Sequence, residues 1–97
     1  MNQKYIQQTT ATLSEALAKA FEQANANLLW INKEKQRYYR ATLQRDLLND
    51  LIVVQSWGGI GSRRGGMKNQ FFADLAQVRA YVKRLHSRRL KHGYILK

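Results

Sequence analysis

Residues 74–92, DLAQVRAYVKRLHSRRLKH, read as a helix that is apolar along one arc and cationic along the opposite arc. Asp74 suits the N-terminal cap and Gly93 suits the C-terminal end. At about 100° per residue, the apolar arc collects Leu75, Val78, Tyr81, Val82 and Leu85. Because 97 residues allow only one modest core, we expect this helix to pack across the remaining elements of a single domain.

Those remaining elements read as strands. Aromatic and β-branched residues favour extended chain, and Asn49 and Asp50 supply a turn between two of the segments. The expected strands are 28–32, 37–45, 51–57, 67–72 and a short last one within 94–97. The predicted class is α+β: an antiparallel sheet of four to five strands, one long C-terminal helix packed across it, and an extra N-terminal helix.

The N-terminal helix is expected over residues 12–28, where Thr12 and Glu15 have the spacing of a capping box. Its narrow apolar stripe recurs at steps of three or four and comprises Leu13, Leu17, Phe21, Ala24 and Leu28. The stripe could pack on the domain's own sheet, bind a protein partner or form a homodimer. We divide the chain into an N-terminal helical extension, 1–27, and a domain, 28–97.

Positive charge is concentrated in the second part of the chain. Residues 1–36 hold four basic and three acidic side chains, a net charge of +1, whereas residues 37–97 hold thirteen basic and three acidic, a net charge of +10. Such a field attracts polyanions, and solvated surfaces usually mix both signs. A nucleic-acid partner is therefore expected, with an anionic membrane less favoured.

The sequence lacks the residues that several classes of function require. The chain has no cysteine, which removes thiolate zinc sites and cysteine nucleophiles. His86 and His92 have no carboxylate nearby in sequence to orient them, and the acidic residues are too scattered for a metal cluster or an acid–base pair. We expect no enzymatic activity, no metal and no cofactor. The absence of an apolar signal sequence or membrane span predicts a cytoplasmic protein.

The segment WGGIGSRRGG, residues 57–66, combines a tryptophan, five glycines and two arginines. It falls between two expected strands, and no lysine followed by serine or threonine closes it, so neither a dinucleotide loop nor a P-loop fits. Trp57 shares a strand face with Val53 and Gln55. Strand tryptophans are usually core residues, but one beside arginines in a flexible loop can grip unpaired bases or sugar rings.

These residues resemble a WGR domain, a family named for a Trp-Gly-Arg signature. The resemblance covers about residues 28–97 and rests on the paired aromatics Tyr38 and Tyr39, the glycine-rich core WGGIG at 57–61, and the closing Gly93-Tyr94. It points to the stand-alone bacterial type, related to the WGR domain of DNA-damage-activated poly(ADP-ribose) polymerases. It implies an antiparallel sheet with a long helix packed across it.

In those polymerases the signature tryptophan stacks on a terminal sugar of DNA and a helix lysine approaches phosphate. The resemblance assigns the first role to Trp57 and the second to Arg89, five residues before Tyr94. Arg89 also interrupts the apolar arc of its helix, so it either extends to water or points into a site. Gly59 stands where the family's signature arginine is expected, and Gln55 and Gln36 replace two further polar residues of the family.

We therefore predict a non-catalytic nucleic-acid-binding module, with DNA favoured over RNA, that contacts ends, nicks or backbone with little sequence specificity. The alternative is a protein-interaction module that docks on an acidic partner. Trp57 would stack, and cations from the loop side and the helix side would contact phosphates: Arg63, Arg64, Lys68, Lys83, Arg84, Arg88, Arg89 and Lys91.

Overall fold

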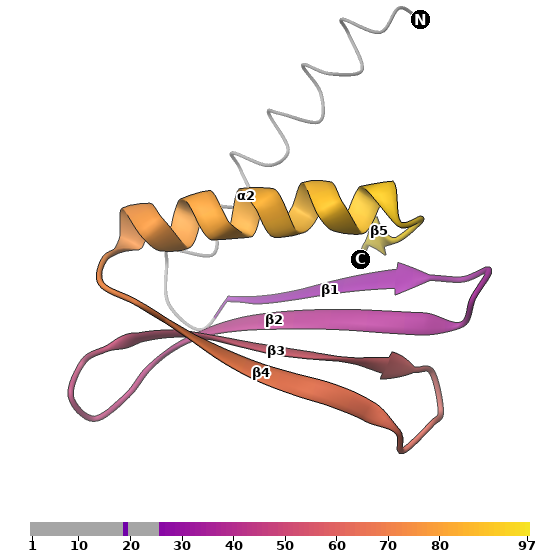
Figure 1. Cartoon of the computed structure of the whole chain (residues 1–97), viewed down its shortest axis with the longest axis horizontal. Helices are drawn as coiled ribbons and strands as arrows, with labels where there is room; N and C mark the ends of the chain where they lie inside the picture. Colours follow the sequence, from indigo (N-terminus) through magenta and orange to yellow (C-terminus); the bar gives the residue numbers. More distant parts are fainter. Residues whose placement is uncertain (1–18, 20–25) are drawn as a thin grey trace, which may run out of the picture.

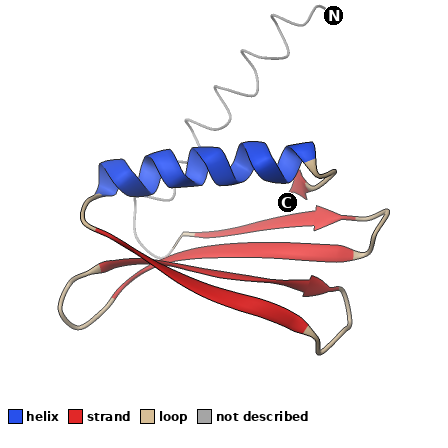
Figure 2. Ribbon diagram, viewed as in Figure 1, coloured by secondary structure: helices blue, strands red, loops and turns tan. Residues whose placement is uncertain are grey.

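Five strands and one long helix make up the computed structural model, which describes Lys19 and residues 26–97. The elements are β1 (Asn27–Asn32), β2 (Arg37–Arg45), β3 (Leu51–Gly59), β4 (Gly65–Phe72), α2 (Leu75–Lys91) and β5 (Ile95–Leu96). Figure 1 shows α2 lying across one face of the sheet, and Figure 2 separates the two layers by type. The α+β class and the five-stranded sheet are confirmed.

The sheet is a meander closed by the C-terminus. Its strand order is β4-β3-β2-β1-β5, with β5 pairing antiparallel to β1. Two cross-strand pairs of β2 and β3 locate the ends of the sheet. The pair of Arg37 with Gly59 lies at one end, and the pair of Arg45 with Leu51 lies at the other. The turns after β1 and β3 therefore lie at the same end as the C-terminus of α2, whereas the β2–β3 turn lies at the opposite end (Figure 1).

Strict alternation sends every second strand residue to the helix. In β1 and in the first five residues of β3 the residues on this face are buried, and those on the other face are exposed or partly exposed. The alternation of burial ends at Trp57, which is partly exposed on the helix face. One core cluster results, composed of Leu28, Trp30, Ala41, Leu43, Leu51, Val53, Val78, Val82, Leu85 and Tyr94. The predicted apolar arc of α2 supplies three of these side chains, with Leu75 and Tyr81 packed beside them.

Both ends of α2 are fixed by hydrogen bonds. Asp74 caps the N-terminus by accepting from the backbone N–H of Gln77 at 2.9 Å. After the last turn Gly93 has a φ of +84°, a conformation that favours glycine. The side chain of Asn32 donates to the carbonyl of His92 at 3.0 Å, which ties the end of β1 to the end of the helix.

The glycine-rich segment is not the flexible loop that its composition suggested. Gly58 and Gly59 complete β3, and Gly65 and Gly66 begin β4. Only residues 60–64 form the turn between the two strands. Three of the glycines, Gly58, Gly65 and Gly66, serve close approach instead; a Cβ on Gly65, for example, would collide with the carbonyl oxygen of Trp57.

The expected N-terminal helix, 12–28, lies outside the described residues except at Lys19 and at its last three positions. At those last positions the expectation was wrong, because Asn27 and Leu28 are the first residues of β1. Leu28 continues the apolar spacing of the preceding segment, but its pairing with Ala41 and its burial in the sheet core give it a strand conformation.

A buried histidine links the helix to β1. His86 is fully buried, and its Nδ1 accepts a hydrogen bond from the indole N–H of Trp30 at 3.0 Å. The ring is therefore neutral with its proton on Nε2, which has no hydrogen-bond partner among the described residues. Burial lowers the pKa of His86 below its ordinary value.

This histidine should make the fold acid-sensitive. Because the pKa of His86 is lower in the folded chain, the unfolded chain binds more protons below about pH 6.5. The free energy of unfolding should then fall by up to about 1.4 kcal/mol for each pH unit below that value. Urea unfolding at pH 5, 6 and 7 should show this slope in the parent chain and a flatter one in His86→Gln.

His92→Gln is the matched control, because His92 is exposed. It should keep the pH slope of the parent chain. If His86→Gln kept that slope too, the protonation of His86 would not be its cause.

Candidate nucleic-acid interface

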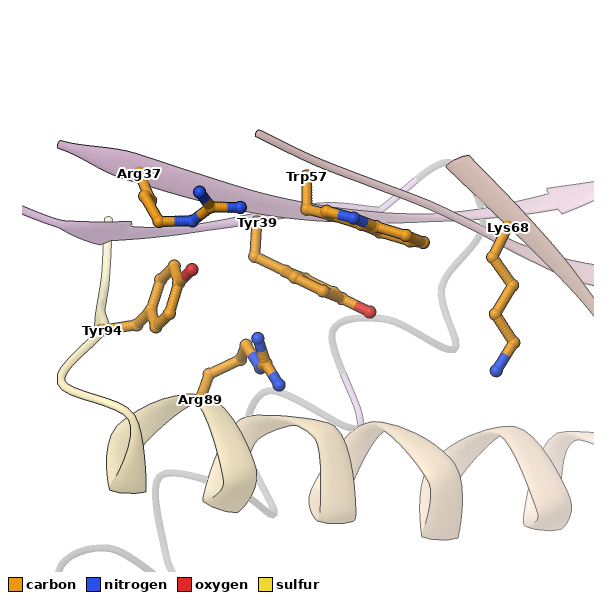
Figure 3. A pocket seen from close by; sticks show the side chains of 6 residues that line it. All are labelled: Arg37, Tyr39, Trp57, Lys68, Arg89 and Tyr94. Atoms are coloured by element: carbon orange, nitrogen blue, oxygen red, sulfur yellow. The ribbon is translucent and has the colours of Figure 1, made fainter. Parts of the chain in front are cut away.

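A pocket opens between the sheet and the last turns of α2, at the end of the sheet where the β1–β2 and β3–β4 turns lie. Three cationic and three aromatic side chains line it: Arg37, Tyr39, Trp57, Lys68, Arg89 and Tyr94. They come from three strands, the helix and the segment after it (Figure 3). None of these six is acidic, so the pocket suits an anion that also presents a flat or apolar surface.

Two aromatic rings form the wall of the pocket. Tyr39 and Trp57 are cross-strand neighbours, and their rings stack with centroids 5.7 Å apart at 11°. Trp57 is partly exposed rather than sealed in the core. On the β4 side the indole lies over Gly66, where any Cβ would overlap the ring. The indole is therefore held in one orientation with part of its surface open to the pocket.

Arg89 lies against this aromatic wall. Its guanidinium carbon is 4.4 Å from the centroid of the Tyr39 ring and 5.3 Å from that of Tyr94. Of the two directions considered for this arginine, the structure shows it pointing into the pocket rather than extending to water. Within the described part of the chain no carboxylate pairs with Arg89, and its buried Nε has no hydrogen-bond partner. Cation–π contacts thus hold the charge in place.

A buried amide fixes the orientation of Tyr39. The side-chain oxygen of Gln55 accepts hydrogen bonds from the hydroxyls of Tyr39 at 2.6 Å and Tyr81 at 2.9 Å. Burial, reinforced by the neighbouring Tyr81, raises the pKa of Tyr39, although Arg89 and Arg88 act in the opposite direction. Tyr39 consequently remains a neutral donor at physiological pH, and Gln55 anchors the ring on which Trp57 and Arg89 rest.

The structure divides the predicted site residues into three groups. Trp57, Lys68 and Arg89 meet in the pocket. Arg63 and Arg64 lie exposed in the β3–β4 turn at the same end of the sheet, but they are not among its lining residues. The remaining four lie together on the side of α2 that faces away from the sheet: Lys83, Arg84, Arg88 and Lys91.

Three lining residues were missed as site residues at the sequence level. Tyr39 and Tyr94 carried the family resemblance without being assigned contacts, and Arg37 drew no attention. Alternation along β2 places Arg37 and Tyr39 on one face, but only the strand register puts Tyr39 beside Trp57. The pairing of β2 with β3 is therefore the information that the sequence lacked.

The fold and the pocket together define a class: a small α+β domain with a cationic, aromatic-lined pocket between its helix and its sheet. The family model of the WGR domain matches residues 22–97, and the chain belongs to this family. Neither the comparison with curated proteins nor the one with solved structures gave a match. In poly(ADP-ribose) polymerases the WGR domain is a nucleic-acid-binding type of module and is itself non-catalytic.

Two other kinds of feature, a metal site and a membrane span, were sought in the described residues. Within Lys19 and 26–97, His, Cys, Asp and Glu side chains form no group of three or more that could hold a metal ion. Helices in that part of the chain are also too short or too polar to cross a membrane.

Gly66→Ala should displace the Trp57 indole, because the added Cβ would overlap the ring. Overpacking of this kind costs about 1–3 kcal/mol in the free energy of unfolding. Urea unfolding and tryptophan emission should both report the change. Gly59→Ala is the control, since its Cβ would come no closer than 3.3 Å to another atom, at the Ser62 side chain. Equal effects of the two substitutions would contradict the assigned role of Gly66.

Proposed function

We propose that this chain is a non-catalytic nucleic-acid-binding module that takes a DNA end, nick or other exposed sugar face into the pocket. One observation carries the proposal: the indole of Trp57 is stacked on Tyr39 and lines one pocket with the cations of Arg37, Lys68 and Arg89. Stacking against a ring is how proteins hold unpaired bases and exposed sugars, and the cations suit the flanking phosphates.

The proposal assigns two roles to the residues of the site, stacking and phosphate binding. The open part of the Trp57 ring stacks on the terminal sugar or base. Arg37, Lys68 and Arg89 neutralise phosphates on the helix side of the sheet, and Arg63 and Arg64 extend the cationic surface along the β3–β4 turn. Contacts to phosphate and sugar fix register without reading bases. Binding is therefore expected to show little sequence specificity.

The family membership supports the same proposal at a coarser level, because WGR domains of the polymerases are nucleic-acid-binding modules. Gly59 replaces the signature arginine in this chain. Arg37 pairs directly with Gly59 across the sheet, so a guanidinium is present beside the vacated position. We infer that Arg37 supplies charge that the signature arginine would otherwise provide.

Salt dependence tests the proposal. Fluorescence anisotropy with labelled blunt, nicked, single-stranded and circular DNA, at two or more salt concentrations, gives log K against log salt. The slope should be about −0.9 for each phosphate neutralised. Arg89→Ala should flatten this slope by about one unit. Trp57→Ala should weaken binding to DNA ends and leave the slope unchanged.

Arg45→Ala is the matched control, because Arg45 lies exposed at the opposite end of the sheet and its side chain donates to Asn49 in the β2–β3 turn. It removes one charge and should leave the slope unchanged. An affinity that is indifferent to salt, or a loss of binding equal in Arg45→Ala and Arg89→Ala, would contradict binding in the pocket.

A protein-interaction module is the second candidate, and exposed apolar residues favour it. Met67 and Phe71 are 71% and 60% exposed on the face of the sheet that α2 does not cover. Charge reversal of Arg63 and Arg64 separates the candidates. If DNA binding survives the reversal while a complex with an acidic protein partner is lost, the protein-interaction role is correct.

A further inference from the structure

The side of α2 that faces away from the sheet is a second cationic surface. It is built by six residues at helical spacing, Lys83, Arg84, Ser87, Arg88, Lys91 and His92, which line one shallow hollow. No acidic residue occurs anywhere in α2. Four of the six are Lys or Arg, and none is Trp, Tyr or Phe. We call this set the outer helix surface.

The body of the helix separates the outer helix surface from the pocket. Arg88 and Arg89 are neighbours in sequence, but about 100° of rotation sends their side chains in different directions. Arg89 points to the Tyr39 ring, while Arg88 is exposed. Val82, Leu85 and His86 are buried in the helix. Arg88 lies at the margin of the outer helix surface, because its charge acts on the pKa of Tyr39 in the pocket. Lys91 is separated from Arg89 by about 200° of rotation, across a helix that is roughly 10–12 Å wide with its side chains.

The dimensions of the outer helix surface fit a phosphate backbone. From Lys83 to Lys91 the helix rises roughly 12 Å at about 1.5 Å per residue. Successive phosphates of one DNA strand advance by about 3.4 Å along the duplex axis. The row of cations therefore spans several phosphates of a single strand. The hydroxyl of Ser87 lies between the cations as a neutral donor.

We propose that the outer helix surface is a second nucleic-acid site, which binds the phosphate backbone of a duplex away from its ends. The inference rests on the proposed function of the pocket and adds a partner to it: one molecule holds two nucleic-acid segments, an end in the pocket and an internal stretch on the helix. Binding through contacts to phosphate makes the second site indifferent to ends and to base sequence.

Two substituted chains separate the sites. Arg84→Glu with Lys91→Glu reverses two exposed charges of the outer helix surface, and Trp57→Ala removes the stacking ring of the pocket. The matched control is Arg40→Glu with Arg45→Glu, which changes the net charge equally on exposed positions of β2. Thermal unfolding of each chain confirms that it is folded, and the milder pair Arg84→Ala with Lys91→Ala repeats the test without charge reversal.

Circular and blunt linear duplexes serve as probes. The outer-surface variant should bind circular DNA about tenfold or more weakly at moderate salt, as expected for two lost phosphate contacts and added repulsion. It should keep its preference for linear over circular DNA. Trp57→Ala should lose that preference and keep its affinity for circular DNA. The β2 control should change both affinities equally and only slightly.

Bridging gives a direct readout. A bead-tethered blunt duplex and a free fluorescent circular duplex should be captured together by the parent chain, and by neither the outer-surface variant nor Trp57→Ala. If the outer-surface variant still bridges the two DNAs, or if both variants lose linear and circular binding in parallel, the second site does not exist while the proposed function stands. If the parent chain binds neither DNA at any salt concentration, the proposed function fails and the second site fails with it.

Discussion

Packing of α2 against one face of the sheet determines where the other features of this domain can lie. Val78, Val82 and Leu85 share one core cluster with Trp30 and Val53, and this burial provides the main favourable free energy of folding. The pocket opens near the C-terminus of the helix, where Arg89 takes the place of an apolar residue. The pocket forms where the apolar packing between α2 and the sheet ends.

Partly burying the guanidinium of Arg89 has a desolvation cost that a carboxylate partner would usually offset. Here the rings of Tyr39 and Tyr94 take that place, since each lies within cation–π range. An ion pair would neutralise the pocket, whereas aromatic contacts leave the positive charge available to an incoming anion. The buried Gln55 contributes indirectly, because it holds the hydroxyl of Tyr39 and therefore the ring beneath Arg89.

Periodicity in the sequence was sufficient to predict the helix and the strands, but not which elements pack beside one another. Helix 74–92 and the strands were predicted with boundaries within about two residues, because the apolar arc and the alternation are local signals. The end of the N-terminal pattern was misassigned, since Leu28 satisfies both a helical and an extended spacing. For the site, Trp57, Lys68 and Arg89 were named in advance. Their companions Arg37, Tyr39 and Tyr94 depend on cross-strand register and helix placement, which no local pattern encodes.

Charged residues are distributed unevenly between the two ends of the sheet. This distribution affects how the domain would approach a polyanion. Of the four acidic residues in the described part of the chain, Asp46, Asp50 and Asp74 lie at the end with the β2–β3 turn, and only Glu34 lies at the pocket end. Arg63, Arg64 and the last turn of α2 lie at the pocket end. The field of the described residues is therefore asymmetric. Under the proposed function, long-range attraction would present the pocket first to a polyanion, and the short-range fit of the Trp57 ring would act after that orientation.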